Sequence, residues 1–279
     1  MIRTDPYPMT HETAQFIGII NTTPDSYWDG GKYTTIKSAV KRAGELIDQG
    51  ADIVEVSGES TGPGSSDVDE KVEIERTMPI IQAIKKTYPS AQVSIDTYKS
   101  RVAEEACRAG AMMINDVTAG RANPEIFSVV AKYGTKIVLM YAKDPSPRTT
   151  REAIAYNNVI KTITTFLKKR IDIAQKAGVK KEQIIIDPGL GHFISSDPKY
   201  SFETLRRLDE VVQLGYPVFV SPSRKSFLAG SENLPPGQRL PGTMIASVIA
   251  VVNGASYIRT HDVLEVRRGC EVGRMLSLQ

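Results

Sequence analysis

Side chains that could do chemistry recur at the ends of apolar runs in this sequence. One set consists of three short acceptor side chains and an amine: Asp96, Asn115, Asp187 and Lys225. A carboxylate accepts two parallel N–H bonds from an amidine-like or guanidine-like edge, and the amide and the amine add mixed donor and acceptor contacts. Together these residues favour a site for a flat heterocycle. Asp96 alone has a second explanation, because an Asp that follows a strand often caps the next helix.

A second set contains Asn21, Arg259 and His261. Arginine and histidine side chains suit a phosphate or pyrophosphate, and an amide oxygen is available to Mg²⁺. We therefore predict a diphosphate site, with Mg²⁺ as the cofactor and Asn21 as its ligand. The alternative for His261 is a hydrogen-bonded loop histidine, but it is one of only three histidines and lies in the run RTHD.

A third group lies in the run SPSRKSF, residues 221–227, where Arg224 and Lys225 are adjacent cations. Two neighbouring cations after an apolar run are also typical of a solvated turn. Pro222 and Ser223 indicate instead an organised loop that holds its side chains in place.

Residues this far apart in the chain need a scaffold that brings them together, and eight short apolar runs can provide it. The runs are nearly continuous, as in a parallel sheet that is buried on both faces, and most are followed by helical periodicity. They cover residues 15–20, 52–56, 92–95, 111–114, 136–140, 183–186, 217–221 and 256–259. We predict an α/β fold, a (β/α)8 TIM barrel that forms a single domain over residues 1–279, with the polar residues at one mouth. A doubly wound open sheet is the alternative, although the first run lacks a Gly-rich turn.

Composition narrows the class of protein further. The chain has 279 residues, 41% hydrophobic residues, 24% charged residues and a net charge of +3, which gives no reason to expect nucleic acid as a partner. No apolar run is long enough to span a bilayer, and the N-terminus lacks the apolar region of a signal peptide. The two cysteines have no metal-site or disulfide spacing. We expect a cytoplasmic protein without a membrane partner.

Several stretches together resemble the dihydropteroate synthases, members of the pterin-binding family with the TIM-barrel fold. The resembling stretches follow family order over about residues 15–265: IGIINTTPDSYWDGG, ADIVEVSGESTGPG, SIDTYK, INDV, IIIDPGLG, SPSRKSF and GASYIRTHDV. The resemblance implies an enzyme that joins 6-hydroxymethyl-7,8-dihydropterin diphosphate to p-aminobenzoate. The products would be 7,8-dihydropteroate, a folate precursor, and pyrophosphate.

The resemblance also implies roles for individual residues. The pterin pocket would contain Asp96, Asn115, Asp187 and Lys225. The diphosphate site would contain Asn21, Thr61, Arg259 and His261, with Mg²⁺ at Asn21. The p-aminobenzoate site would contain Thr61, Pro63, Phe193, Ser223 and Arg224. The residues expected to take part in catalysis are Asn21, Asp96, Lys225, Arg259 and His261. Many members of the family are homodimers, although the apolar residues of 263–278 fit a helix that packs on its own barrel equally well.

Some positions depart from the family pattern. Gly62 stands where an arginine of a mobile loop is usual, and Arg121, Lys143 or Arg148 could substitute for it. Other departures are Glu55-Val56-Ser57-Gly58, Met140-Tyr141 and His192-Phe193. Two alternatives therefore stay open: a corrinoid-linked methyltransferase on the same barrel, and a pterin-binding relative without catalytic activity.

The run NTTPDSYWDGG, residues 21–31, places many polar residues and the only tryptophan after the first apolar run. We expect residues 22–31 to form a flap over the p-aminobenzoate side, with Gly30 and Gly31 as its hinge. Tyr27 and Trp28 would then cover the aromatic substrate. A solvent-facing Trp28 in a local turn is the alternative.

Overall fold

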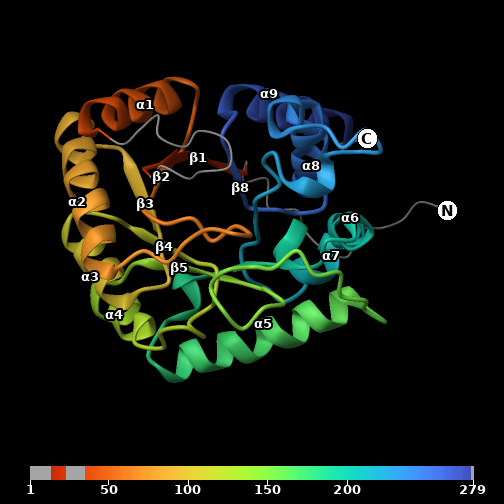
Figure 1. Cartoon of the computed structure of the whole chain (residues 1–279), viewed down its shortest axis with the longest axis horizontal. Coiled ribbons are helices and arrows are strands. Elements are labelled where there is room, and N and C mark those ends of the chain that lie inside the picture. Colours follow the sequence, from red (N-terminus) through yellow and green to blue (C-terminus); the bar gives the residue numbers. More distant parts are fainter. Residues whose placement is uncertain (1–13, 23–34, 278–279) are drawn as a thin grey trace.

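Eight parallel strands form the centre of the molecule in a computed structural model that describes residues 14–22 and 35–277 (Figure 1). The strands are hydrogen-bonded in the order β6-β5-β4-β3-β2-β1-β8-β7, and a bridge between Ile186 and Val218 joins the two ends. The prediction of a (β/α)8 barrel is therefore confirmed. The strands are β1 (Gln15–Asn21), β2 (Ile53–Ser57), β3 (Gln92–Asp96), β4 (Met113–Asp116), β5 (Lys136–Met140), β6 (Ile184–Asp187), β7 (Phe219–Val220) and β8 (Tyr257–Thr260).

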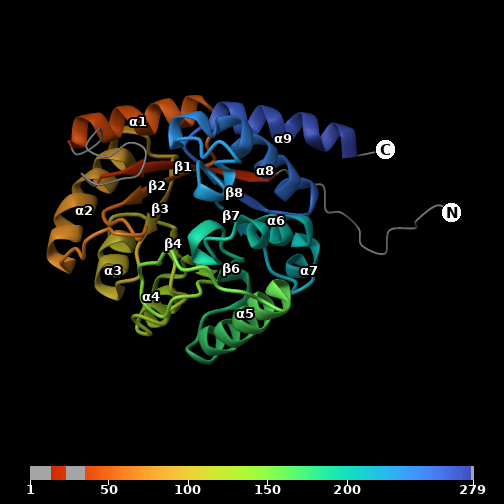
Figure 2. The same cartoon turned by 45° about the vertical axis from the view of Figure 1, so that its right-hand side comes forward.

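Helices surround the strands on the outside (Figure 2). Several begin where the sequence supplies a polar cap: Thr35, Asp69, Asn158 and Asp197 each accept a backbone N–H of the first turn. The helices are α1 (Ile36–Asp48), α2 (Glu70–Thr87), α3 (Ser100–Arg108), α4 (Ile126–Tyr133), α5 (Val159–Lys176), α6 (Pro198–Arg206), α7 (Leu208–Val212), α8 (Leu240–Val252) and α9 (Val263–Ser277).

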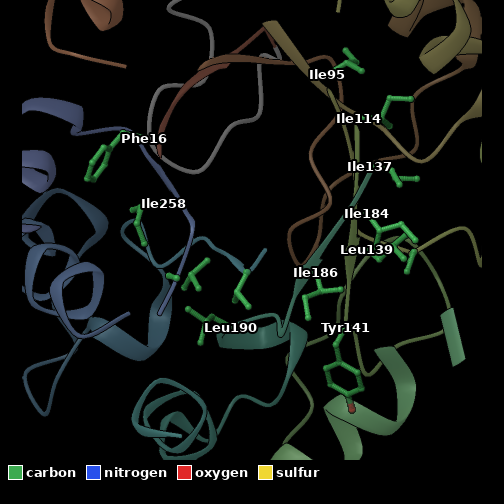
Figure 3. Close-up of a cluster of buried hydrophobic side chains, with 14 of the residues drawn as sticks. Phe16, Ile95, Ile114, Ile137, Leu139, Tyr141, Ile184, Ile186, Leu190 and Ile258 are labelled. Atoms are coloured by element: carbon green, nitrogen blue, oxygen red, sulfur yellow. The ribbon is translucent and has the colours of Figure 1, made fainter. Parts of the chain in front are cut away.

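The hydrophobic core has two layers, because alternate residues of each strand face opposite sides of the sheet. Outward-facing side chains pack under the helices, among them Ile95, Ile114, Leu139, Ile186 and Ile258 (Figure 3). Inward-facing side chains form a separate apolar cluster inside the barrel. Its members are Ile17, Ile53, Met113, Val138, Ile185, Phe219 and Tyr257.

Above this interior cluster the inward-facing positions become polar. On β2, Ile53 is followed at alternate positions by Glu55 and Ser57, and on β8, Tyr257 is followed by Arg259. The barrel thus has an apolar floor and a polar mouth at the carboxyl ends of its strands, which is where TIM-barrel enzymes build their active sites. The predicted flap lies outside the described residues except for Thr22, which is buried. Tyr27 and Trp28 are thus outside the described residues, and Asn21 is inside them.

No helix in the described ranges is long and apolar enough to cross a membrane.

Candidate active site

An arginine between two carboxylates occupies the centre of the barrel mouth. The guanidinium of Arg259 forms ion pairs with Glu55 of β2 and, at 3.0 Å, with Asp96 of β3. Glu55 is fully buried and also accepts a hydrogen bond from Ser94 at 3.1 Å. Asp96 does not cap the next helix, since Lys99 is the N-cap residue of α3 and no side chain caps it. Arg259 therefore joins the two predicted sets of residues instead of lying apart from the acceptors.

The remaining acceptors lie on the neighbouring strands. Asn115 is 4% exposed, donates to Glu55 at 3.4 Å, and has a buried Oδ1 without a hydrogen-bond partner among the described residues. Asp187 is 2% exposed and accepts the backbone N–H of Gly189 at 2.7 Å. Lys225 extends from the loop after β7, where its Nζ contacts the Leu190 carbonyl at 3.3 Å and lies 5.1 Å from the centre of the Phe193 ring.

Burial shifts the titration of this group. It raises the pKa of Asp96 to about 7, against the opposing charge of Arg259. It raises the pKa of Asp187 to about 6, against the charge of Lys225. It lowers the pKa of Lys225 to about 8, and the charge of Asp187 opposes that shift. Carboxylates with pKa values this close to neutrality favour a cationic or N–H-rich ligand that would stabilise their charged form.

Ser223 and His261 form a second contact at the mouth, on the side of β7 and β8. Ser223 Oγ lies 2.9 Å from His261 Nδ1 and accepts the backbone N–H of His261 at 3.2 Å. Arg42 of α1 donates to the His261 carbonyl at 2.8 Å. The end of β1, which carries Asn21, is tied to β2 because Thr22 donates to the Ser57 carbonyl at 2.9 Å.

Arg224 has an unusual conformation and many partners. Its φ of 54° lies in the left-handed region, which is costly for a residue with a Cβ atom. Its guanidinium forms two bonds to Asp262, at 2.6 and 2.9 Å, and donates to the Pro236 and Gly237 carbonyls. These contacts hold the strained turn between Ser223 and Lys225. Most hydrogen bonds of the Arg224 guanidinium therefore stabilise the loop itself.

A cavity of about 200 Å³ opens between these groups. All the predicted site residues line it except Asn115 and Asp187, which are buried. The lining includes Asn21, Thr61, Pro63, Asp96, Phe193, Ser223, Arg224, Lys225, Arg259 and His261, together with Ser57, Glu59, Ser60, Gly62, Thr149, Leu190, His192, Ser226, Pro236 and Arg239.

Several of the other residues that line the cavity were not predicted from the sequence. Glu55 was also passed over as a site residue, although a charged residue inside the buried run DIVEV was a usable signal. Glu59, Thr149 and His192 come from loops, and their contacts cross between elements. The pKa of His192 is lowered mainly by burial and, to a smaller extent, by nearby cations.

The three proposed substitutes for the missing arginine at Gly62 lie in different places. Arg148 contacts the loop that contains Gly62, because it forms ion pairs with Glu59 and, at 3.1 Å, with Asp67. Lys143 is paired with Asp144, and Arg121 lies over the Phe166 ring. Tyr141, one of the residues that depart from the family pattern, points away from the mouth toward α5 (Figure 3), and its hydroxyl contacts that of Tyr156 at 3.1 Å.

The described residues contain no group of three or more His, Cys, Asp or Glu side chains arranged to hold a metal ion. The side chain of Asn21, which lines the cavity, fits Mg²⁺, because Mg²⁺ usually keeps several waters, binds substrate phosphates and needs few ligands from the protein.

Comparison with known proteins agrees with this geometry. The family model described as "Pterin binding enzyme" matches residues 17–261. The dihydropteroate synthase of Clostridium beijerinckii is 42% identical over 262 residues, which cover 94% of this chain and 93% of that protein. A Yersinia pestis dihydropteroate synthase in complex with a sulfonamide drug superposes with a TM-score of 0.89 at 32% identity, covering 94% of both chains. A Coxiella burnetii dihydropteroate synthase in complex with pteroic acid superposes with a TM-score of 0.86 at 33% identity, covering 95% of this chain and 94% of that one.

The fold and the comparisons thus define a TIM-barrel enzyme of the pterin-binding class. The chain belongs to the pterin-binding enzyme family, and within it to the dihydropteroate synthases.

Proposed function

We propose that this chain joins 6-hydroxymethyl-7,8-dihydropterin diphosphate to p-aminobenzoate at the cavity in its barrel mouth. The observation that carries the proposal is the meeting of Asp96, Lys225, Arg259 and His261 on one cavity of a barrel that belongs to this family. The pterin, the diphosphate and the arylamine then occupy three adjoining parts of the mouth.

The pterin binds between β3, β4 and β6. Asp96 and Asp187 accept N–H groups of the pterin edge, and the buried Oδ1 of Asn115, which has no partner among the described residues, accepts another. Lys225 donates to the opposite part of the ring. The carboxylates also stabilise positive charge that develops on the pterin as the C–O bond breaks.

The diphosphate binds on the β8 and β1 side, at Asn21, Thr61, Arg259 and His261. Arg259 already lies beside Asp96, so it can contact the phosphates while it remains next to the pterin. We propose that Asn21 offers its amide oxygen to Mg²⁺, which when bound would neutralise part of the charge of the leaving pyrophosphate.

The p-aminobenzoate binds beside the loops, against Thr61, Pro63, Phe193, Ser223 and Arg224. Its amine attacks the exocyclic carbon of the pterin, the carbon–oxygen bond breaks, and pyrophosphate leaves with the bonding electrons. The new arylamine loses a proton to solvent. Because an aromatic amine is nucleophilic at neutral pH, Asn21, Asp96, Lys225, Arg259 and His261 act by binding and charge stabilisation.

Release of pyrophosphate by the purified protein tests this function. With Mg²⁺, dihydropterin diphosphate and p-aminobenzoate we expect release that depends on all three. If the protein binds the pterin in calorimetry but releases no pyrophosphate, it is a non-catalytic pterin-binding protein. Methyl transfer from methyltetrahydrofolate to a cobalt cofactor would instead identify a corrinoid-linked methyltransferase.

We also propose a homodimer formed through α8 and α9, which lie side by side (Figure 2). These helices expose large apolar side chains: Ile245, Ile249 and Val252 on α8, and Val272, Met275 and Leu276 on α9. Ile245 is 62% exposed and Met275 is 69% exposed. Large exposed apolar side chains on two adjacent helices favour a partner, and a second copy would bury them on both sides. Sedimentation should show a dimer that Met275→Glu converts to a monomer; a wild-type monomer would rule the dimer out.

Two further properties complete the proposal. We propose that residues 1–279 form one domain, since each strand of the barrel is followed by a helix that packs on it. We also propose a cytoplasmic location, which is supported by Cys107 and Cys270, both present as free thiols.

A further inference from the structure

The segment after β5, residues 141–158, connects the loops on either side of it across the barrel mouth. Thr149 makes contacts in both directions. Its backbone N–H donates to the Thr61 carbonyl at 3.2 Å, and its hydroxyl lies 2.8 Å from the His192 carbonyl. Thr61 lies in the loop after β2 and His192 in the loop after β6, and each loop forms a wall of the cavity. Thr149, which contacts both, is 4% exposed.

Asp144 fixes the conformation of this segment by accepting hydrogen bonds from within it. Its carboxylate accepts the hydroxyl of Thr149 at 2.8 Å, the backbone N–H of Thr150 at 2.9 Å and the hydroxyl of Thr150 at 3.0 Å. The Thr149 hydroxyl has a single hydrogen, so it donates to Asp144 or to His192 at any one time. Burial disfavours the charge of Asp144, but hydrogen bonds, first that of Lys143, lower the pKa of this carboxyl overall.

Each wall has a second attachment to the same segment. On one side, the backbone N–H of Lys143 donates to the Phe193 carbonyl at 2.8 Å. On the other side, Arg148 donates to the Ser66 carbonyl at 2.8 Å and pairs with Glu59 and Asp67. Glu59 is also held by Lys99, whose Nζ reaches Glu73 at 2.7 Å. The loop that contains Gly62 is thereby fixed at several points by side chains that lie outside it.

We propose that Thr149 is a positioning residue that sets the separation of the two walls of the aminobenzoate site. It acts through Thr61 on one wall and through His192 and the adjoining Phe193 on the other. The inference rests on the proposed function, because it assigns the space between these walls to the arylamine. Loss of the Thr149 hydroxyl should weaken aminobenzoate binding and leave pterin binding, which depends on strand ends, unchanged.

The test compares Thr149→Val with Thr149→Ser in steady-state pyrophosphate release. Valine keeps the shape and the backbone N–H but removes the hydroxyl, whereas serine keeps the hydroxyl. We expect Thr149→Val to raise the KM for p-aminobenzoate about tenfold, the effect of one lost hydrogen bond. The KM for the pterin diphosphate should stay within about twofold, because valine keeps the backbone contact with Thr61, which also belongs to the proposed diphosphate site. Thr149→Ser should resemble the wild type.

Asp144→Asn provides a second variant, since it weakens the same contacts without altering a cavity-lining side chain, and it should raise the same KM. Thermal unfolding of each variant shows whether the fold is kept. Equal increases in both KM values, or a serine variant that behaves like valine, would overturn the positioning role. If the wild type is active and Thr149→Val leaves the KM for p-aminobenzoate unchanged, only this inference is overturned. If the wild type is inactive, the proposed function is overturned as well.

Discussion

The two halves of the barrel mouth are built in different ways. The half that we propose for the pterin uses strand ends, where Asp96, Asn115 and Asp187 are fixed by the parallel register of β3, β4, β5 and β6. The half that we propose for the aminobenzoate uses three loops that are held to one another by Thr149, Arg148 and Asp144. Substitutions in the first half should therefore remove binding outright, whereas substitutions in the second should change the fit of one substrate.

The largest expected effect follows the loss of a buried charge in the proposed pterin pocket. Lys225→Ala and Asp187→Asn should each weaken binding of the pterin diphosphate by about 100-fold or more, because either change leaves the other charge without its partner. Titration calorimetry measures the affinity, and Lys199→Ala, which alters an exposed lysine on α6, is the control. Wild-type affinity in both variants would show that the pterin binds elsewhere.

A smaller effect is expected for Arg259, which we propose contacts both the pterin and the diphosphate. Arg259→Ala should weaken binding of the pterin diphosphate by about 10- to 100-fold, as expected for loss of charge-assisted hydrogen bonds. A pterin without phosphates should lose less affinity in the same calorimetric experiment. An equal loss for both ligands would remove Arg259 from the diphosphate site.

The pH dependence of pterin binding tests the proposed role of Asp96. The pKa of Asp96 is raised to about 7 in the ligand-free protein, so below that pH a proton must leave before the carboxylate can accept N–H bonds. The affinity for the pterin should therefore fall by up to about tenfold per pH unit as the pH decreases below about 7. Affinity measured from pH 5 to 8 checks this, and Asp96→Asn should bind more weakly with a flatter profile. An affinity that rises as the pH falls would contradict the assignment.

The smallest expected effect lies outside the site. Tyr141→Phe removes the hydroxyl contact with Tyr156 in the core beside α5 and should lower the free energy of unfolding by about 1 kcal/mol. Both KM values should stay at the wild-type level, because Tyr141 points away from the mouth. Denaturant unfolding measures the free energy of unfolding, and steady-state kinetics measure the two KM values. A raised KM for either substrate would place Tyr141 in the site.

The same difference explains what the sequence could predict. The strand-end residues were predictable because apolar runs, parallel pairing and a barrel bring their carboxyl ends to one mouth, whatever the loops do. Glu55 was also within reach, since a charged residue inside a buried run needs a partner. The roles of Thr149, Asp144 and Glu59 were not predictable, because contacts such as Thr149 with Asp144 and Arg148 with Glu59 join residues 5 and 89 positions apart and depend on loop conformation. Asp96 as a helix cap was a reasonable local alternative, and the Arg259 ion pair decides against it.

A crystal structure with bound pteroate tests the account most directly, since this oxidised form of the product would span both halves of the mouth. We predict that its pterin ring lies among Asp96, Asn115, Asp187 and Lys225, and that its benzoate ring lies between Thr61–Pro63 and Phe193 with the Thr149 contacts intact. A pterin ring held by the loops, or a benzoate ring placed over the strand ends, would contradict the division of the mouth into these two halves.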